Sequence, residues 1–212
     1  MAILLSEISN AVLEGETSGI VPLCQKAVEE KISVEDILKK GLIAGMNEVG
    51  NLFKDGEMFV PEVLVSAKAL QKGVDYLSPH LKEANIGRIG KVITVTVEGD
   101  LHDIGIKLVG MMLEGAGFEV INIGVDRKAA DIVEKVKELK PDILAMSAML
   151  TTTMENMREV ISILKEEGLH SDLHVMVGGA PLSPLYAEKI DANYSADASS
   201  AVVLAKKLLD VA

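Results

Sequence analysis

The chain has 212 residues, of which 49% are hydrophobic, and its mean hydropathy is +0.30. A chain of this length and composition can bury one large core or two smaller ones, which excludes a disordered protein and favours one or two domains. The formal net charge of −11 argues against a nucleic-acid partner, because phosphate binding depends on Lys and Arg displacing counterions. We therefore expect proteins and small ligands as partners.

The sequence offers neither a membrane anchor nor a disulfide framework. No apolar run approaches the roughly 20 residues that a membrane-spanning helix needs. Ser6 and Glu7 interrupt the N-terminal stretch MAILLSEISN too early for a secretory signal, so we expect a cytoplasmic protein with no membrane contact. The single Cys24 excludes an intramolecular disulfide and is typical of a small buried helix residue.

The first 86 residues have the apolar spacing of helices, and no segment among them is typical of a strand. Two short helices are predicted at about 6–13 and 18–30. Ser33 can cap a third that runs to about residue 52, and a fourth begins near Pro61, a residue favoured in a first helical turn. These segments predict a small four-helix bundle as an N-terminal cap domain, residues 1–86.

The segment EANIGRIGK, residues 83–91, contains two glycines and little periodicity, so we expect a linker there. Beyond it, short β-rich runs alternate with helical stretches, and a last helix is predicted at about 197–211. The predicted strands are 91–97, 119–124, 142–147, 174–178 and 192–195. This alternation predicts an α/β domain over residues 91–212, with a flavodoxin-like (Rossmann-like) five-stranded parallel sheet, helices on both faces and right-handed crossovers.

Polar residues and glycines follow three of these strands, where α/β sheets bind ligands. Asp100, His102 and Asp103 follow the first strand, 147–153 is rich in hydroxyls after the third, and Gly178 opens a glycine pair after the fourth. A neutral imidazole can bind a metal through one nitrogen while a carboxylate holds the other N–H, and Asp100, at the strand end, is the better candidate for that carboxylate. Zinc requires three or four protein ligands, so a metal here would need a cofactor to supply the remainder.

Structural explanations for the same residues stay open. Asp100 or Asp103 could cap the helix that opens near Ile104, and the hydroxyls from Ser147 to Thr153 could be helix caps. A glycine pair by itself indicates only a turn. The joint placement of these groups at successive strand ends favours a ligand site.

The motifs Asp100-x-His102-x-x-Gly105, Ser147-x-Met149 and Gly178-Gly179 resemble the D-x-H-x-x-G, S-x-L and G-G signature of cobalamin-binding domains that hold B12 with its nucleotide tail displaced. The phrase GLIAGMNEVGNLFKDGEMFVPEVLVSAKAL resembles the four-helix cap joined to that domain in methyltransferases. The resemblance covers nearly the whole chain. It extends to the free-standing corrinoid proteins of anaerobic methyl-transfer systems, working on methylamines, methanol, methoxylated aromatics or betaines, and to the B12-binding module of methionine synthase.

The resemblance implies a role for each matching residue. His102 would replace dimethylbenzimidazole as the lower axial ligand of cobalt, Asp100 would hold its other nitrogen, and Thr153 would complete the relay. Gly105 would leave room for the tail. The other implied cofactor contacts are Phe59 and Val63 of the cap, Asp103 and Ile104 beside the ligand, Ser147, Met149, Thr151, Gly178 and Gly179 along the tail, and Tyr194, Ala196 and Asp197 at its far end. Met149 replaces the usual Leu at similar volume; Ile106-Lys107 and Asn193 also depart from the pattern.

The implied function is that of a carrier without catalysis of its own, which binds cobalamin in the base-off, His-on form. It would shuttle a methyl group between a substrate-specific methyltransferase and an acceptor methyltransferase, with a reductive activase as a further partner. The cap would have to move off the corrin for transfer, which makes the linker a hinge candidate. Neither donor nor acceptor is indicated, because donor choice belongs to the partner enzyme.

Three alternatives remain from the sequence. A B12-dependent sensor or regulator can share the cap and the cofactor motif, although such proteins usually carry a further DNA-binding or signalling domain. An adenosylcobalamin mutase subunit shares the sheet-domain motif but not ordinarily this cap. A flavin-binding flavodoxin-like protein is disfavoured, because the turn after the first strand offers Asp-Leu-His-Asp where a phosphate site needs a run of Ser, Thr and Gly.

Overall fold

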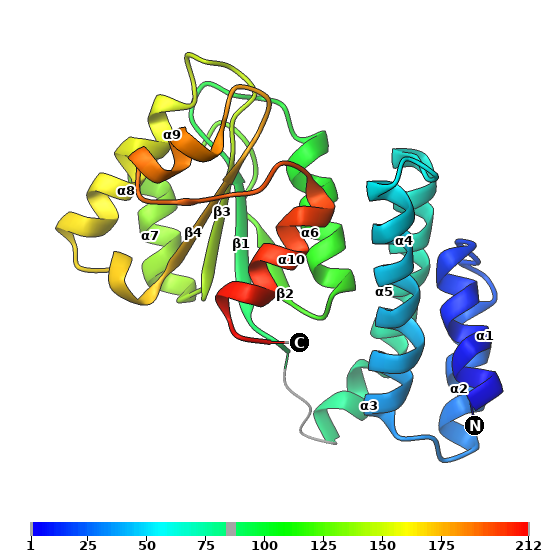
Figure 1. Cartoon of the computed structure of the whole chain (residues 1–212). Helices are drawn as coiled ribbons and strands as arrows, with labels where there is room; N and C mark the ends of the chain where they lie inside the picture. The colour runs from blue at the N-terminus through cyan, green and yellow to red at the C-terminus, as the bar shows by residue number, and fades with distance from the viewer. Residues whose placement is uncertain (1, 84–87, 212) are drawn as a thin grey trace. The chain divides into compact units, whose positions relative to one another are not determined.

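A computed structural model describes residues 2–83 and 88–211, which form two compact units (Figure 1). The first consists mainly of residues up to Arg88, and the second mainly of residues from Ile89 onward. Of the predicted linker and hinge, 83–91, residues 84–87 lie outside the described part of the chain.

Helices form the first unit, as predicted. They are α1 (Ala2–Leu13), α2 (Ile20–Glu29), α3 (Val34–Asp36), the π-helix η1 (Ile37–Ile43), α4 (Ala44–Lys54) and α5 (Val60–Glu83). The segments α3, η1 and α4 follow one another without a break and together correspond to the predicted third helix. Its start is the one expected, because the Ser33 side chain accepts a hydrogen bond from the Asp36 N–H at 3.1 Å.

The π-helical segment was not anticipated from the sequence. It lies where this helix packs closely against α1: a Cβ at Gly41 would lie 2.9 Å from Ile8 Cγ2, and a Cβ at Gly45 would overlap the Ser9 carbonyl oxygen. Because these two glycines, four residues apart, have no side chains, the backbone of this helix can lie directly against α1. The pattern of apolar residues does not distinguish this local widening from an ordinary α-helix.

Apolar side chains fill the interior of the first unit. Completely buried members are Ile8, Val12, Ile20, Cys24, Ile37, Leu42, Val49 and Leu77. Burial raises the pKa of the Cys24 thiol to about 11, which keeps it neutral and inert. The predicted role of this cysteine as a small buried helix residue is confirmed.

The second unit contains a parallel sheet with the strand order β2-β1-β3-β4-β5. The strands are β1 (Lys91–Thr96), β2 (Glu119–Asn122), β3 (Ile143–Ser147), β4 (His174–Gly178) and β5 (Asn193–Tyr194). This order is that of flavodoxin-like folds, and all five predicted strands are present; the fourth has the predicted bounds, the first and third are one residue shorter, and the second and fifth are two residues shorter. The flavodoxin-like prediction is therefore confirmed.

Helices cover both faces of this sheet (Figure 1). They are α6 (Ile104–Gly115), α7 (Ala129–Leu139), α8 (Glu155–Glu166), α9 (Pro184–Lys189) and α10 (Ala198–Leu208), with a short 3-10 turn, η2 (His170–Asp172), before β4. On one side α7, α8 and α9 pack against the strands, and α6 and α10 lie on the other. The predicted two-sided cover is confirmed.

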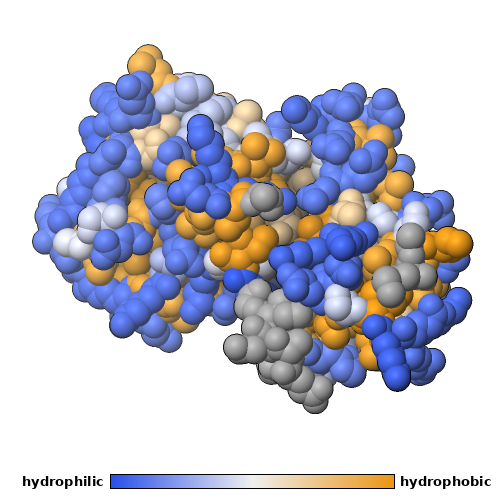
Figure 2. Space-filling view, turned by 60° about the horizontal axis from the view of Figure 1, so that its bottom comes forward, coloured by the Kyte–Doolittle hydropathy of each residue, from blue (hydrophilic) through white to orange (hydrophobic). Residues whose placement is uncertain are grey.

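Figure 2 shows one face of the molecule coloured by hydropathy. On the face shown in Figure 2, hydrophilic residues predominate, and hydrophobic residues form smaller areas among them, in keeping with the net charge of −11. Among the residues that the structure describes, no helix combines the length and the apolar character needed to cross a bilayer.

Candidate functional site

The site lies where the strand order reverses. β1 and β3 are neighbours in the centre of the sheet, and from them the chain proceeds to opposite edges. The register pairs Thr96 with Ser147, so the loops that follow the two strands leave the sheet at the same level. Such a switch point is the usual ligand site of an open α/β sheet.

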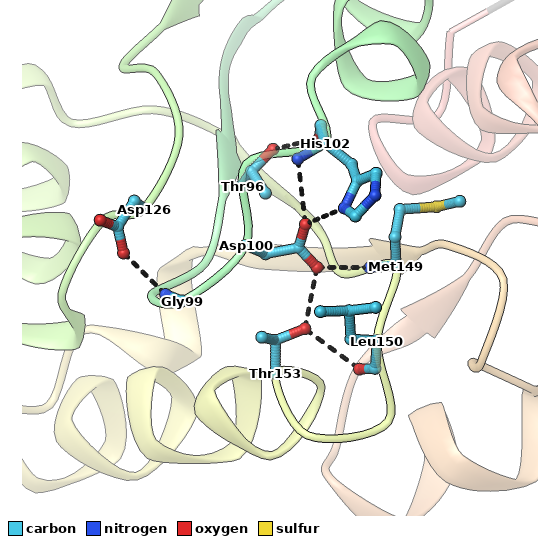
Figure 3. A network of polar contacts seen from close by, with 8 residues as sticks. All are labelled: Thr96, Gly99, Asp100, His102, Asp126, Met149, Leu150 and Thr153. Carbon is cyan, nitrogen blue, oxygen red and sulfur yellow. Dashed lines mark hydrogen bonds and ion pairs between the residues drawn. The ribbon is translucent and has the colours of Figure 1, made fainter.

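One carboxylate links these two loops (Figure 3). Asp100 Oδ1 lies 2.7 Å from His102 Nδ1 and also accepts the backbone N–H of His102 at 3.0 Å. Asp100 Oδ2 accepts the backbone N–H of Met149 at 2.7 Å and the hydroxyl of Thr153 at 2.8 Å. Residues about 50 positions apart in the sequence therefore hold one buried side chain in place.

The Thr153 hydroxyl has two acceptors in reach but only one proton. Its oxygen also lies 3.0 Å from the Leu150 carbonyl oxygen. A hydrogen bond to an ionised carboxylate is the stronger of the two, so the proton points to Asp100. Thr153 thus donates to the carboxylate that contacts His102, and its role in a relay to a cofactor stays a prediction.

The surroundings of Asp100 keep it ionised. Burial by itself raises the pKa of this carboxyl, but the N–H groups of Met149 and His102, the imidazole and the Thr153 hydroxyl together lower it to about 2. A carboxylate only accepts hydrogen bonds, so the network assigns the proton of a neutral imidazole to Nδ1. Nε2 then keeps a free lone pair on a side chain that is 57% exposed.

The second acidic neighbour has a different partner. Asp103 forms an ion pair with Lys107 in the first turn of α6, and this pair lowers the pKa of its carboxyl. The expectation that Asp100 would be the partner of the imidazole agrees with these contacts. A Cβ placed on Gly105, next along the helix, would meet no atom within 4 Å, so the start of α6 borders open space.

Exposed apolar side chains border the imidazole in both loops. They are Leu101 from the loop after β1, Ile104 at the start of α6, and Met149 and Leu150 from the loop after β3. Large apolar residues exposed together are typical of a surface that another molecule covers. We call these four residues the apolar rim.

Below the rim, the sheet face toward α6 carries small and hydroxyl-bearing residues. The register aligns Thr96, Ser147 and Gly178 in one row, and Thr94 beside Ala145 in the next. A Cβ on Gly110 of α6 would lie 3.8 Å from the Thr94 hydroxyl oxygen, so this face packs under α6. That hydroxyl is buried and has no hydrogen-bond partner among the described residues.

The glycine pair after β4 is sterically required. Gly179 has a φ of +131°, and a Cβ there would overlap the Ala148 carbonyl oxygen. A side chain at Gly178 would come within 3.0 Å of the Ser195 carbonyl oxygen. The two glycines therefore bring β4 close to the loops after β3 and β5.

Other predicted residues are not gathered at this place. Tyr194 packs against the apolar core on the α7–α9 side, Ala196 is exposed, and Asp197 Oδ1 accepts the Ser200 N–H at 2.7 Å as the cap of α10. Thr151 is exposed in the loop after β3. Cofactor contacts by these four residues stay predictions.

The two cap residues belong to the first unit. Phe59 is 67% exposed just before α5, whereas Val63 is completely buried. A contact between either residue and the cofactor stays a prediction.

Some residues at the site were missed in the sequence. Ser195 is buried beside Gly178, and the two-residue period of a strand could have placed it opposite Tyr194. The Thr96 hydroxyl donates to the His102 carbonyl oxygen at 3.1 Å, and Asp126 contacts the turn before Asp100. Nothing in the sequence pattern points to Asp126, which follows a different strand.

The described residues contain no group of three or more His, Cys, Asp or Glu side chains placed to hold a metal ion. What they do offer is a single imidazole with a fixed tautomer.

Comparison with known proteins agrees with this arrangement. Two family models described as B12 binding domain match the chain, over residues 90–203 and 4–78. Dimethylamine corrinoid protein 3 of Methanosarcina acetivorans is 45% identical over 207 residues, which cover 97% of each chain.

Two solved structures resemble the chain along most of its length. The methanol:cobalamin methyltransferase complex MtaBC from Methanosarcina barkeri matches with 30% identity and a TM-score of 0.88, over 98% of this chain and 80% of the other. A cobalamin-binding protein from Desulfitobacterium hafniense DCB-2 matches with 33% identity and a TM-score of 0.81, over 96% and 98%. The chain therefore belongs to the corrinoid protein family of methyltransferase systems, whose cofactor is cobalamin or a related corrinoid.

Proposed function

We propose that this chain is a methyl carrier that holds cobalamin with His102 in place of the cofactor's own nucleotide base. It receives a methyl group from a substrate-specific methyltransferase and presents it to an acceptor methyltransferase. The observation that carries this proposal is the 2.7 Å contact between His102 Nδ1 and Asp100, which leaves Nε2 free at the carboxyl edge of the sheet.

The residues present fit such a cofactor. A corrinoid brings cobalt inside its own macrocycle, so one imidazole from the protein is sufficient as a lower ligand. The apolar rim suits the flat face of a macrocycle. The open space at Gly105, the small residues Ser147 and Gly178, and the unpaired Thr94 hydroxyl suit a displaced tail that enters between the sheet and α6.

When bound, the corrinoid supplies the metal centre that accepts and releases the methyl group. The chain positions it. Asp100 accepts the hydrogen bond from Nδ1 of His102, which fixes the orientation of the ring and makes Nε2 a stronger electron-pair donor to a metal ion. Thr153 and the Met149 N–H hold Asp100 in turn, so that the imidazole is presented in one direction only. With the corrinoid bound, the apolar rim would help to exclude water beside the imidazole.

The proposal includes three partner enzymes. The donor methyltransferase would act on a methylated amine, since a curated relative of nearly the full length is a dimethylamine corrinoid protein. An acceptor methyltransferase would take the methyl group. A reductive activase would restore the cofactor after accidental oxidation.

The ligand role is tested by reconstituting the protein with a corrinoid and recording the visible spectrum of wild type, His102→Ala and His174→Ala. His174 is an exposed histidine at the start of β4 and serves as the matched control. We expect only His102→Ala to show the spectrum of a corrinoid without an imidazole ligand. An unchanged spectrum in His102→Ala would exclude His102 as the ligand.

The carrier role is tested by incubating the reduced, corrinoid-loaded protein with a dimethylamine methyltransferase and dimethylamine. We expect the spectrum of the methylated corrinoid to appear, and to disappear when an acceptor methyltransferase and its methyl-accepting substrate are added. If neither methylamine, methanol nor methoxylated donors with their enzymes methylate the cofactor, the carrier role is wrong.

A further inference from the structure

A tight turn precedes the His–Asp pair. The Asp100 N–H donates to the Val97 carbonyl oxygen at 3.2 Å, which closes a four-residue β-turn, and Gly99 in its third position has a φ of +78°. A positive φ at that position is typical of a type II turn. In such a turn the central peptide, here Glu98–Gly99, decides the turn type, because its reversal converts type II into type I.

Side chains from two other elements hold this peptide at both ends. The Gly99 N–H donates to Asp126 Oδ1 at 2.7 Å, and the Glu98 carbonyl oxygen accepts from the Asn156 side-chain amide at 2.7 Å. Figure 3 shows the first of these contacts next to the His102 network. A reversed peptide would present its oxygen to a carboxylate and its N–H to an amide donor, so both contacts oppose reversal.

The backbones of Asp126 and Asn156 are themselves held by hydrogen bonds. The Asp126 N–H donates to the Asp100 carbonyl oxygen at 3.1 Å, and Asp126 has a φ of +52°, which is uncommon for a residue other than glycine. Asn156 lies in the first turn of α8, and its N–H donates to the carbonyl of Thr153, the residue whose hydroxyl holds the Asp100 carboxylate. The same segments thus hold both the peptide before Asp100 and its side chain.

We propose that Asp126 and Asn156 are positioning residues that lock the Glu98–Gly99 peptide and thereby fix the direction in which His102 offers Nε2. The inference rests on the proposed function, since it assumes that His102 is the axial ligand. Without the lock, the turn populates a second form in which Asp100 and the imidazole are displaced, and coordination by His102 weakens.

Three variants separate the hydrogen bond from the backbone conformation. Asp126→Gly removes the acceptor and adopts the positive φ without strain. Asp126→Asn keeps an acceptor oxygen and also tolerates a positive φ, so it is the matched control. Asn156→Ala removes the donor and places the best helix former in α8.

The readout is the EPR spectrum of the Co(II) form of the reconstituted protein, prepared with ¹⁵N-labelled histidine. Coordination by a histidine nitrogen splits each cobalt line into a doublet in labelled protein and a triplet in unlabelled protein. We expect the ratio of uncoordinated to coordinated protein to rise about threefold to tenfold in Asp126→Gly and Asn156→Ala, less than the roughly 10- to 100-fold effect of losing a direct partner of a ligand. Asp126→Asn should resemble wild type.

Each outcome decides between the claims. Wild-type ratios in both Asp126→Gly and Asn156→Ala would overturn the inference and leave the ligand role intact. A defect in Asp126→Asn as large as in Asp126→Gly would overturn it too, because the acceptor would then be irrelevant. Absence of ¹⁵N splitting in wild type would overturn the proposed ligand role and the inference together. Denaturant unfolding of the apo-proteins identifies a variant that fails to fold, and if Asp126→Gly does so, Asn156→Ala alone decides.

Discussion

The two faces of the central sheet are formed by alternate residues of the same strands, and they differ sharply. Toward α7, α8 and α9 the strands present Ile93, Val95, Leu144, Met146, Val175 and Val177, all nearly or completely buried. Toward α6, near the carboxyl edge, they present Thr94, Thr96, Ala145, Ser147 and Gly178. One face is a continuous hydrocarbon core, whereas the other combines hydroxyls and small residues near the carboxyl edge with the buried apolar residues Val92, Ile143 and Met176.

This difference indicates that the face toward α7, α8 and α9 contributes mainly to folding stability, whereas the face toward α6 is suited to ligand binding. Burying branched aliphatic side chains contributes most of the folding free energy of a domain. Small residues and a hydroxyl without a partner contribute little to it, but they provide space and hydrogen-bonding groups for a ligand. If the proposed function is right, the α6 face gives up stability in the free protein for a site that the cofactor would complete.

The largest effect is expected on the apolar face. Leu144→Ala should lower the free energy of unfolding of the apo-protein by about 2–5 kcal/mol, through lost burial and the cavity left behind. Ser147→Ala, on the α6 face, should change it by less than about 1 kcal/mol but weaken corrinoid binding. Denaturant unfolding and corrinoid titration measure the two quantities. Equal destabilisation by both variants would contradict the difference between the faces.

An intermediate effect is expected at Asp100, where the edge of the sheet meets the site. Its pKa of about 2 lies below the ordinary value of 3.8, so its ionised form stabilises the folded state above about pH 4, and this contribution is lost as the pH falls toward 2. Asp100→Asn should therefore cost about 2 kcal/mol at neutral pH. The difference between wild type and variant should shrink between pH 4 and pH 2. A difference in unfolding free energy that is constant over this range would show that the charge of Asp100 is not what stabilises the fold.

The smallest effect is expected at Thr94. Thr94→Val replaces a buried, unpaired hydroxyl by a methyl group of similar shape, so the apo-protein should become more stable by up to about 1 kcal/mol. The same change should leave corrinoid binding equal or weaker. Thermal unfolding of apo and loaded protein measures both. A loss of apo-protein stability would contradict this expectation. It would indicate that the Thr94 hydroxyl has a hydrogen-bond partner in solution, such as a water molecule.

Most of the fold could be predicted from the local pattern of apolar and polar residues. Two-residue alternation and helical spacing predicted the strands and helices, because each depends on neighbours within a few positions. The π-helical segment at 37–43 was not predicted, because the spacing of its apolar residues does not distinguish it from an α-helix.

At the site, the sequence by itself determined what is local: the strand end, the Asp100–His102 pair two residues apart, and the glycines that permit tight turns. Only the tertiary structure decided which distant groups complete it. Met149 and Thr153 reach Asp100, and Asp126 reaches Gly99, because β1 lies between β3 and β2. Alternation along the strand places Tyr194 and Ser195 on opposite faces, but only the pairing of β5 with β4 decides that Tyr194 meets the apolar core and that Ser195 lies beside Gly178. Periodicity along one strand says which residues share a face, whereas the choice of neighbouring strand depends on packing of the whole domain.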